Sequence, residues 1–152
     1  NENSANESTV PDSEINHQYS KSLEFEEDFA WYVNKYIHPE VYYFSFLRPL
    51  NELQIAALFS RFPQHFFSFR SCNIGSKTDS WCGHCPKCLF TYTILSPFVP
   101  AKTLKKIFGK DLLNDLTLKP VLDELDGDTE IKPFECVGTP EEVKAALWKT
   151  EE

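Results

Sequence analysis

The sequence predicts an α/β fold that is mostly helical, with few short strands and one cysteine-rich loop. The chain has 152 residues, of which 41% are hydrophobic, and this is enough for one domain with a core. Apolar residues recur at helical spacing in several segments, whereas only short runs are β-prone. Four of the five cysteines lie within residues 71–88. These observations favour helices arranged around that loop.

The first segments are expected to be a loop followed by a helix. Asn, Ser, Glu and Pro dominate residues 1–20, which predicts a loop or a short strand. Ser22 is the expected N-cap of a helix that runs to about Ile37, with three glutamates near its start, where the helix dipole favours negative charge. Its apolar side chains share one face, which we expect to be buried: Phe25, Phe29, Tyr32, Val33 and Tyr36.

The next segments alternate between extended and helical patterns. VYYFSF at 41–46 is β-prone and predicts a short strand, and FFSF at 66–69 predicts another extended piece. Between them, the apolar residues from Leu53 to Arg61 predict a second helix, which stops before Pro63.

Helical patterns dominate the rest of the chain. The residues from Pro86 to Leu95 predict a buried helix, and 101–108 and 111–125 predict a helical tail. The last helix has a clear start signal, because Thr139 can act as its N-cap, Pro140 suits its first position and Glu142 completes a capping box.

The charge of the chain disfavours two classes of partner. Fifteen Lys and Arg residues against 23 Asp and Glu residues give a net charge of -8, so no general attraction to phosphate backbones exists and we expect no nucleic-acid partner. No apolar run reaches about 18 residues, and the polar, acidic N-terminus is unlike a signal peptide. The sequence therefore predicts a soluble, cytoplasmic protein with no membrane partner.

The chain is expected to be the C-terminal portion of a larger protein. It contains no Met, and its first residues already have the polar composition of an active-site segment. We expect three parts: an active-site-like loop segment at 1–22, core helices and strands with the cysteine loop (71–88) at 23–98, and a helical C-terminal tail at 99–152.

The cysteine loop predicts a metal site. Its spacing is C-x9-C-x2-C-x2-C, formed by Cys72, Cys82, Cys85 and Cys88. Disulfides are disfavoured in a reducing compartment, and CxxC turns direct two sulfurs at a common centre, so four thiolates predict a tetrahedral structural zinc site with no open position. An iron–sulfur cluster is the alternative that four thiolates also allow.

Three other side chains near the metal site are assigned weaker roles. His84 lies between ligands and can in principle replace a sulfur, but we expect it to point to solvent. Lys77 and Lys87 are expected to keep the loop solvated, and a cationic loop beside an anionic UDP substrate is the alternative. The fifth cysteine, Cys136 in FECVG, is expected to be a small core residue or a pocket wall.

Longer motifs carry a family resemblance. The segment RPLNELQIAALFSRFPQHFFSFRSCNIGSKTDSWCGHCPKCLF resembles the C-terminal part of the PP-loop ATP pyrophosphatase superfamily, including the 7-cyano-7-deazaguanine synthases, whose cysteines bind zinc. Within it, NENSANES, NHQYSKSLEFE, WCGHCPKCLF and FECVGTPEE are more similar to the ATP-dependent UDP-N-acetylmuramoyl-L-alanyl-L-glutamate epimerases of bacterial peptidoglycan synthesis.

The resemblance implies a reaction and its requirements. It implies conversion of the terminal L-Glu of UDP-MurNAc-L-Ala-L-Glu to D-Glu through an acyl-adenylate. The reaction would consume ATP, require Mg2+ and release AMP and pyrophosphate. The superfamily's phosphate-binding loop, Ser-Gly-Gly-x-Asp-Ser, is absent from these residues. An upstream PP-loop domain of the same protein is therefore an expected partner, and the fragment alone is expected to be inactive.

Candidate residues for this chemistry are polar groups in non-repetitive segments. Glu7, His17 and Lys21 are the candidates for catalytic roles, with Glu7 as a possible base. Arg48 and Arg70 can clamp a carboxylate or phosphate, although a structural salt bridge is equally consistent with each. The candidates for contacts with nucleotide or substrate are Asn1, Glu2, Ser4, Asn6, Ser20, Arg48 and Arg70.

Two rival functions are compatible with the sequence. One is another adenylating enzyme of the superfamily, such as an amidoligase or an RNA-thiolating enzyme. The other is a non-catalytic zinc module that binds a protein partner, which a large exposed aromatic patch would favour.

Overall fold

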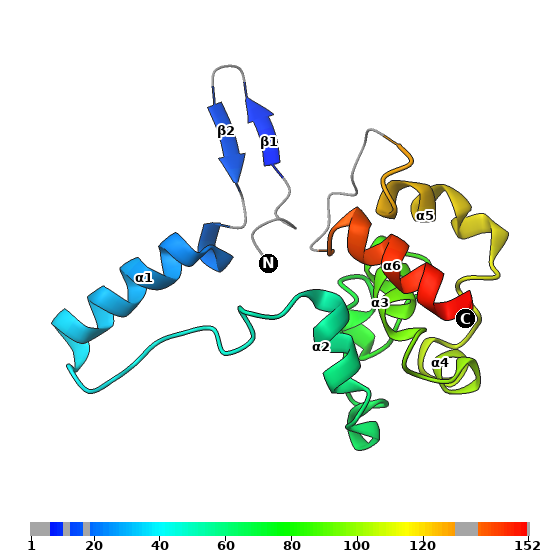
Figure 1. Cartoon of the computed structure of the whole chain (residues 1–152), viewed down its shortest axis with the longest axis horizontal. Coiled ribbons are helices and arrows are strands. Elements are labelled where there is room, and N and C mark those ends of the chain that lie inside the picture. Colours follow the sequence, from blue (N-terminus) through cyan, green and yellow to red (C-terminus); the bar gives the residue numbers. More distant parts are fainter. Residues whose placement is uncertain (1–6, 11–12, 17–18, 130–136, 152) are drawn as a thin grey trace. The chain divides into compact units, whose positions relative to one another are not determined.

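The computed structural model describes residues 7–10, 13–16, 19–129 and 137–151 (Figure 1). The chain divides into two compact units, residues 1–50 and 51–152. The described residues are mostly helical, as predicted, whereas the three-part division at residues 22 and 98 stays a prediction. No helix in these residues combines the length and the apolar character needed to cross a membrane.

The first unit begins with a hairpin and continues into a capped helix. Strands β1 (Glu7–Val10) and β2 (Ser13–Asn16) pair antiparallel, with Glu7 opposite Asn16. After a 3-10 turn, helix α1 (Leu23–Tyr32) starts at the predicted N-cap, because the Ser22 hydroxyl accepts a hydrogen bond from the Phe25 amide at 3.1 Å. A π-helical turn, Val33–Ile37, extends α1 to the predicted end.

The prediction that α1 buries one face is wrong within this unit. Of its five apolar positions only Val33 is buried, and Tyr32 and Tyr36 are 48% and 59% exposed. The apolar stripe is present and contacts Tyr19 of the preceding turn and Tyr43 of the following segment, but the described residues of this unit do not cover it with a second layer of secondary structure. A stripe at helical spacing identifies an apolar face without identifying what covers it.

The predicted strands at 41–46 and 66–69 do not form. A β-prone segment needs a neighbouring strand to satisfy its backbone groups, and none of the described residues provides one for 41–46. Tyr43 instead packs edge-on against Phe29 of α1, with ring centroids 4.7 Å apart. At 66–69 the chain turns, because a 3-10 helix starts at Pro63 and the Ser68 and Phe69 amides donate to the His65 carbonyl.

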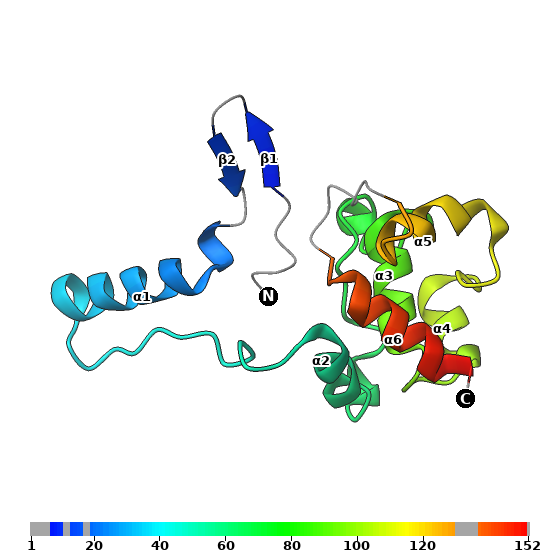
Figure 2. The ribbon, with the colours of Figure 1, turned by 45° about the horizontal axis from the view of Figure 1, so that its top comes forward.

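The second unit surrounds one central helix, α3 (Pro86–Leu95), whose bounds match the prediction. α3 contacts α2 (Glu52–Phe59), α4 (Ala101–Phe108), α5 (Lys119–Leu125) and α6 (Pro140–Glu151) (Figures 1 and 2). Seven of its ten residues are buried, which explains why its sequence shows little polar character on any side. The predicted helix at 111–125 forms only from a 3-10 turn at Leu116 onward.

Glu142 connects the starts of α6 and α2. The predicted capping box is confirmed, because the Thr139 amide donates to Glu142 Oε2 at 2.8 Å and the Glu142 amide donates to the Thr139 hydroxyl at 3.4 Å. The other carboxylate oxygen, Oε1, accepts the Glu52 amide at the first turn of α2 at 2.6 Å. Glu142 is only 7% exposed, and both of its carboxylate oxygens accept backbone hydrogen bonds at the starts of these two helices.

Asp111 connects α3 and α4 through their side chains. Its carboxylate accepts hydrogen bonds from Tyr92 of α3 at 3.1 Å and from Asn114 at 2.8 Å, and it forms an ion pair with Lys105 of α4 at 2.9 Å. Burial acts to raise the pKa of Asp111, but these contacts outweigh burial and lower the pKa to about 2. The residues at 111–115 thus form a loop fixed by side-chain contacts, where the sequence predicted helix.

Replacing Asp111 with Asn should lower the free energy of unfolding by about 1–2 kcal/mol at pH 7, since the charged acceptor is lost. A lowered folded-state pKa contributes stability that is present above pH 4 and disappears as pH falls towards 2. The difference between the two proteins, measured by urea denaturation, should therefore shrink over this interval. Both proteins contain the same four clustered cysteines, so protonation of these thiols at low pH should affect the two stabilities equally.

The matched control is Asp123→Asn, which removes an exposed ion pair with Lys119 within α5. This change should cost no more than about 0.5 kcal/mol. Equal effects of the two substitutions at pH 7 would contradict the role assigned to Asp111.

Candidate metal centre

Four cysteine sulfurs converge at the start of α3. Cys85 is its N-cap and Cys88 lies in its first turn, whereas Cys72 and Cys82 flank the loop that precedes it. The sulfur atoms of Cys85 and Cys88 are 3.5 Å apart, those of Cys82 and Cys88 are 3.6 Å apart and those of Cys72 and Cys85 are 3.8 Å apart. All four lie within 4.8 Å of one another.

These distances match the donor set of a single tetrahedral ion. Zinc–sulfur bonds of about 2.3 Å place the sulfurs of a regular tetrahedron about 3.8 Å apart. A cluster of several irons holds its thiolates farther apart, because metal atoms and bridging sulfides lie between them. The four cysteines can therefore bind a metal such as zinc, as the spacing predicted.

The backbone of the loop is shaped around the sulfurs. The Gly75 amide donates a hydrogen bond to the Cys72 sulfur at 3.1 Å. A Cβ on Gly75 would lie 2.0 Å from the Ser80 carbonyl oxygen, so the close approach of the two sides of the loop requires glycine. Gly83 has φ +71 between the two cysteines of the first CxxC turn, a conformation that glycine adopts without strain.

The electrostatics of the cluster favour a bound cation. A hydrogen bond with Cys88 lowers the pKa of the Cys85 thiol to about 5, against burial, which acts in the opposite direction. The same contact, together with burial, raises the pKa of Cys88, and burial raises the pKa of Cys82. Deprotonation of Cys85 is thus favoured, whereas deprotonation of Cys88 and Cys82 is disfavoured. A divalent cation removes this competition because it stabilises all four thiolates at once.

The other side chains of the loop lie outside the sulfur cluster. His84 is exposed, as expected, and its Nδ1 lies 2.9 Å from the Cys82 carbonyl oxygen. Lys77 is exposed, and the Lys87 ammonium donates to Asn73 Oδ1 at 3.2 Å. Cys136 lies outside the described residues.

The roles assigned to the nucleotide, substrate and catalytic residues all stay predictions. Glu7 lies at the start of β1, and its side chain is not described. Ser20 is exposed in the 3-10 turn before α1, and the neighbouring Lys21 carbonyl accepts from the Arg48 guanidinium at 3.4 Å. The remaining candidates lie outside the described residues: Asn1, Glu2, Ser4, Asn6 and His17.

Arg48 has protein partners within the first unit. Its guanidinium forms an ion pair with Glu26 at 2.6 Å and also donates to the Ser22 carbonyl at 3.3 Å. The hydrogen bond from Arg48 lowers the pKa of Glu26. These contacts fix the segment after residue 40 to the start of α1. A contact of Arg48 with a substrate anion stays a prediction.

Arg70 closes the loop that holds Cys72. Its side chain donates to the Phe69 carbonyl at 2.6 Å and to the Asp79 carbonyl at 3.0 Å. An exposed ion pair with the Asp79 carboxylate, at 3.4 Å, adds to this closure. The two ends of the loop are therefore held next to the sulfur cluster, and a role of Arg70 in binding substrate stays a prediction.

Sequence reasoning did not identify Trp81 as part of the site. It precedes Cys82, is 9% exposed and packs between Phe69 and Phe108, with ring centroids 5.2 and 4.6 Å away. Its indole Nε1 is buried, and none of the residues that the structure describes offers it a hydrogen-bond partner. The ring joins the cysteine loop to the core, and its position directly before a CxxC motif was the only available signal.

A second group of possible ligands lies in the turn after α5. One carboxylate oxygen from each of three aspartates lies within 4.8 Å of the others, namely Asp123, Asp126 and Asp128. Asp123 forms an ion pair with Lys119, and Asp128 forms one with Lys144 at 3.4 Å. This arrangement is that of an acidic surface turn whose carboxylates pair with nearby lysines.

Comparison with known proteins gives matches over most of the chain. The MurL N-terminal domain family matches residues 1–46, and the MurL C-terminal domain family matches residues 68–152. The UDP-N-acetyl-alpha-D-muramoyl-L-alanyl-L-glutamate epimerase of Xanthomonas oryzae pv. oryzae is 41% identical over 140 residues, which cover 88% of this chain and 31% of the relative. Proteins of the same name from Micromonospora sp. and Salinispora tropica are 42% and 41% identical over 138 residues.

The chain spans a little under a third of the length of these curated relatives, with 30–31% of each covered. No solved structure was found to match it.

Replacing Cys85 with Ser should abolish stoichiometric metal binding and lower the free energy of unfolding by more than about 3 kcal/mol, since three thiolates leave the site incomplete. The metal content can be measured by mass spectrometry of the purified protein, and stability by denaturant titration. His84→Ala is the matched control, because this exposed neighbour is not a ligand and its loss should preserve the metal. A Cys85→Ser protein that is metal-free and equally stable would contradict a structural metal.

Proposed function

Because the chain belongs to the MurL epimerase family, we propose that it is the C-terminal part of an ATP-dependent enzyme that converts the terminal L-Glu of UDP-MurNAc-L-Ala-L-Glu to D-Glu. The observation that carries the proposal is the 41% identity to the Xanthomonas oryzae enzyme over 88% of this chain. The four clustered cysteines support the same assignment, because the resemblance implies zinc at these positions.

The chemistry explains why such an epimerase consumes ATP. The α-proton of the terminal glutamate is difficult to remove, because the adjacent carboxylate is already negative and the carbanion would add a second charge. An acyl-adenylate removes that charge and allows the electron pair to delocalise into the carbonyl group. Proton removal then becomes accessible to an ordinary side-chain base.

The proposed reaction consists of adenylation, proton exchange at Cα and hydrolysis. A carboxylate oxygen attacks the α-phosphorus of ATP, and the bond to the β-phosphate breaks, so pyrophosphate leaves with its electron pair. A base removes the Cα proton, and a proton returns to the opposite face. Water then cleaves the acyl-adenylate and yields D-Glu and AMP. Mg2+ would neutralise the phosphates during the first step.

The chain's own part in this reaction is proposed to be structural and positional. We assign zinc to the four cysteines as a closed site without an open coordination position, which holds α3 and the preceding loop in place. The phosphate-binding loop is assigned to an upstream PP-loop domain of the same polypeptide, so the isolated chain is expected to be inactive. A substrate carried on UDP and a requirement for ATP place the reaction in the cytoplasm.

The candidate catalytic and binding residues keep their assignments within this proposal. Glu7, His17 and Lys21 are the candidates for catalytic roles, with Glu7 as the possible base, and the candidates for anion contacts are Ser20, Arg48 and Arg70. The N-terminal polar residues are the candidates for nucleotide contacts: Asn1, Glu2, Ser4 and Asn6.

The proposal predicts that the complete natural polypeptide containing this chain forms D-Glu and AMP together when it is incubated with ATP, Mg2+ and UDP-MurNAc-L-Ala-L-Glu. Chiral analysis of the released glutamate and an AMP assay measure the two products. AMP formation only with a different carboxylate would retain the adenylation chemistry and overturn the substrate. No AMP with any substrate would contradict the enzymatic proposal and favour the non-catalytic zinc module.

Replacement of Glu7 by Gln in the complete polypeptide should lower the rate of epimerisation by about 10²–10⁴-fold if Glu7 is the base, because a general base contributes a rate factor of that size. AMP release should be affected less, since adenylation precedes removal of the proton. Chiral analysis and the AMP assay on the same samples separate the two steps. Unchanged formation of D-Glu would remove Glu7 from the candidates.

A further inference from the structure

The first unit carries an unusual share of exposed apolar side chains. Twelve of the eighteen exposed large hydrophobic side chains of the described residues lie within residues 19–47, and eight of these twelve are aromatic. Tyr42, Phe44 and Phe46 are 82%, 63% and 81% exposed. We call this set the aromatic face: Tyr19, Leu23, Trp31, Tyr32, Tyr36, Ile37, Val41, Tyr42, Tyr43, Phe44, Phe46 and Leu47.

The aromatic face is too large for an ordinary soluble surface. An aromatic side chain contributes about 150–250 Å², so eight that are on average more than half exposed present on the order of 900 Å². The largest apolar patch of a typical soluble monomer is about 300–600 Å². The excess indicates a surface that a further protein segment covers.

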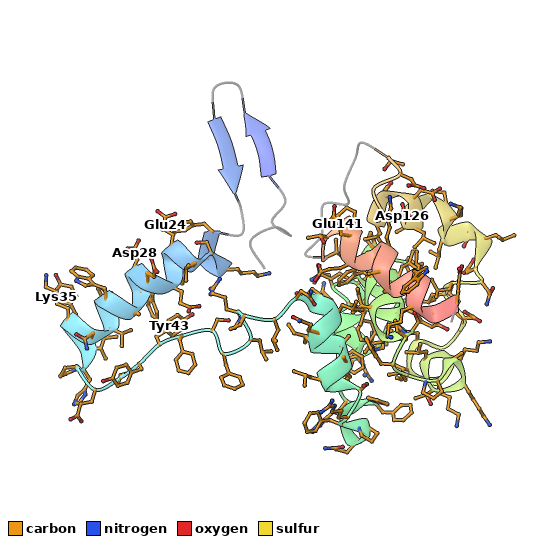
Figure 3. All side chains as sticks on the ribbon, in the orientation of Figure 1. Glu24, Asp28, Lys35, Tyr43, Asp126 and Glu141 are labelled. Atoms are coloured by element: carbon orange, nitrogen blue, oxygen red, sulfur yellow. The ribbon has the colours of Figure 1, made fainter. Side chains whose placement is uncertain are left out.

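Specific contacts hold this surface together as one layer. The ion pair between Arg48 and Glu26 fixes the segment 41–47 at one end of α1, and the edge-on packing of Tyr43 on Phe29 fixes its middle. Figure 3 shows Tyr43 on the side of the segment that faces α1. Contacts within the first unit therefore hold the segment 41–47 beside α1. These contacts leave every residue of α1 itself at least partly exposed.

The comparisons show where a covering segment could come from. Residues 1–46 match the MurL N-terminal domain family, and more than two thirds of the Xanthomonas oryzae relative lies outside the match. A domain is built from at least two packed layers, and the described residues of the first unit provide a single layer beside α1. We propose that the aromatic face packs against a further segment of the MurL N-terminal domain in the same polypeptide, of the kind that the relatives carry outside the matched region.

The first unit carries exposed charges of both signs. Glu24, Glu27, Asp28 and Glu40 are exposed, and Figure 3 shows Glu24 and Asp28 on the side of α1 opposite Tyr43. The Lys35 ammonium lies 4.6 Å from the centroid of the Trp31 ring, within the aromatic face. The proposal therefore rests on the exposed apolar area and not on charge. The inference rests on family membership and not on the proposed reaction, so its test uses stability and hydrogen exchange, not activity.

The test compares the 152-residue chain with the complete natural polypeptide, each carrying Tyr42→Ser, Phe44→Ser and Phe46→Ser together. In the complete polypeptide the substitutions should lower the Tm by more than about 5 °C, because buried aromatic area is lost. In the 152-residue chain they should leave the Tm unchanged. Trp148→Ser is the matched control, since this aromatic residue of α6 is 66% exposed and its replacement should leave both proteins unchanged.

A second measurement needs no variant. Hydrogen exchange of the backbone amides of residues 23–47 should be at least about tenfold slower in the complete polypeptide than in the 152-residue chain. Equal exchange, or an unchanged Tm of the triple variant in the complete polypeptide, would overturn the proposal. An equal loss of Tm in both proteins would also overturn it. Sedimentation of the 152-residue chain would then identify the alternative. Sedimentation that depends on concentration would assign the face to a second copy, and sedimentation independent of concentration would assign it to a contact within this chain.

Discussion

The second unit depends on the requirement that four sulfurs share one centre. Cys72 and Cys82 come from the loop, whereas Cys85 and Cys88 belong to the first turn of α3. Bringing them within 4.8 Å of one another fixes where α3 starts and where the loop before it ends. α3 in turn is the helix against which α2, α4, α5 and α6 pack. A metal–ligand arrangement at one end of a buried helix therefore sets the reference position for the whole unit.

The two units satisfy the same physical demands in different ways. In the second unit, apolar faces are covered, and the loops are held by side chains such as Asp111 and Glu142 that accept hydrogen bonds from distant elements. In the first unit, α1 has an N-cap and an ion pair to the following segment, but its apolar side is only partly covered by the described residues. Local capping contacts are thus present in both units, whereas a buried core is found among the described residues of the second unit.

The features that sequence predicted are those that neighbouring residues determine. Ser22, the Thr139-Pro140-Glu142 box and the cysteine spacing specify a local geometry directly, and the structure contains each of them. The strand predicted at 41–46 failed because strand formation depends on a partner that the local sequence does not contain. The contact of Glu142 with Glu52 and that of Tyr92 with Asp111 were also invisible, since each joins residues that only the fold brings together.

The contact between Glu52 and Glu142 spans 90 residues, and this separation affects how the protein is made. Synthesis at about 5–20 residues per second delivers α2 some 5–18 s before the carboxylate that its first turn requires. Until α6 leaves the ribosome, the nascent chain also exposes the side of α3 that α6 covers. Closure of this unit is therefore expected to wait until α6 has left the ribosome, whereas the cysteine loop, which is made earlier, can bind a metal ion before that.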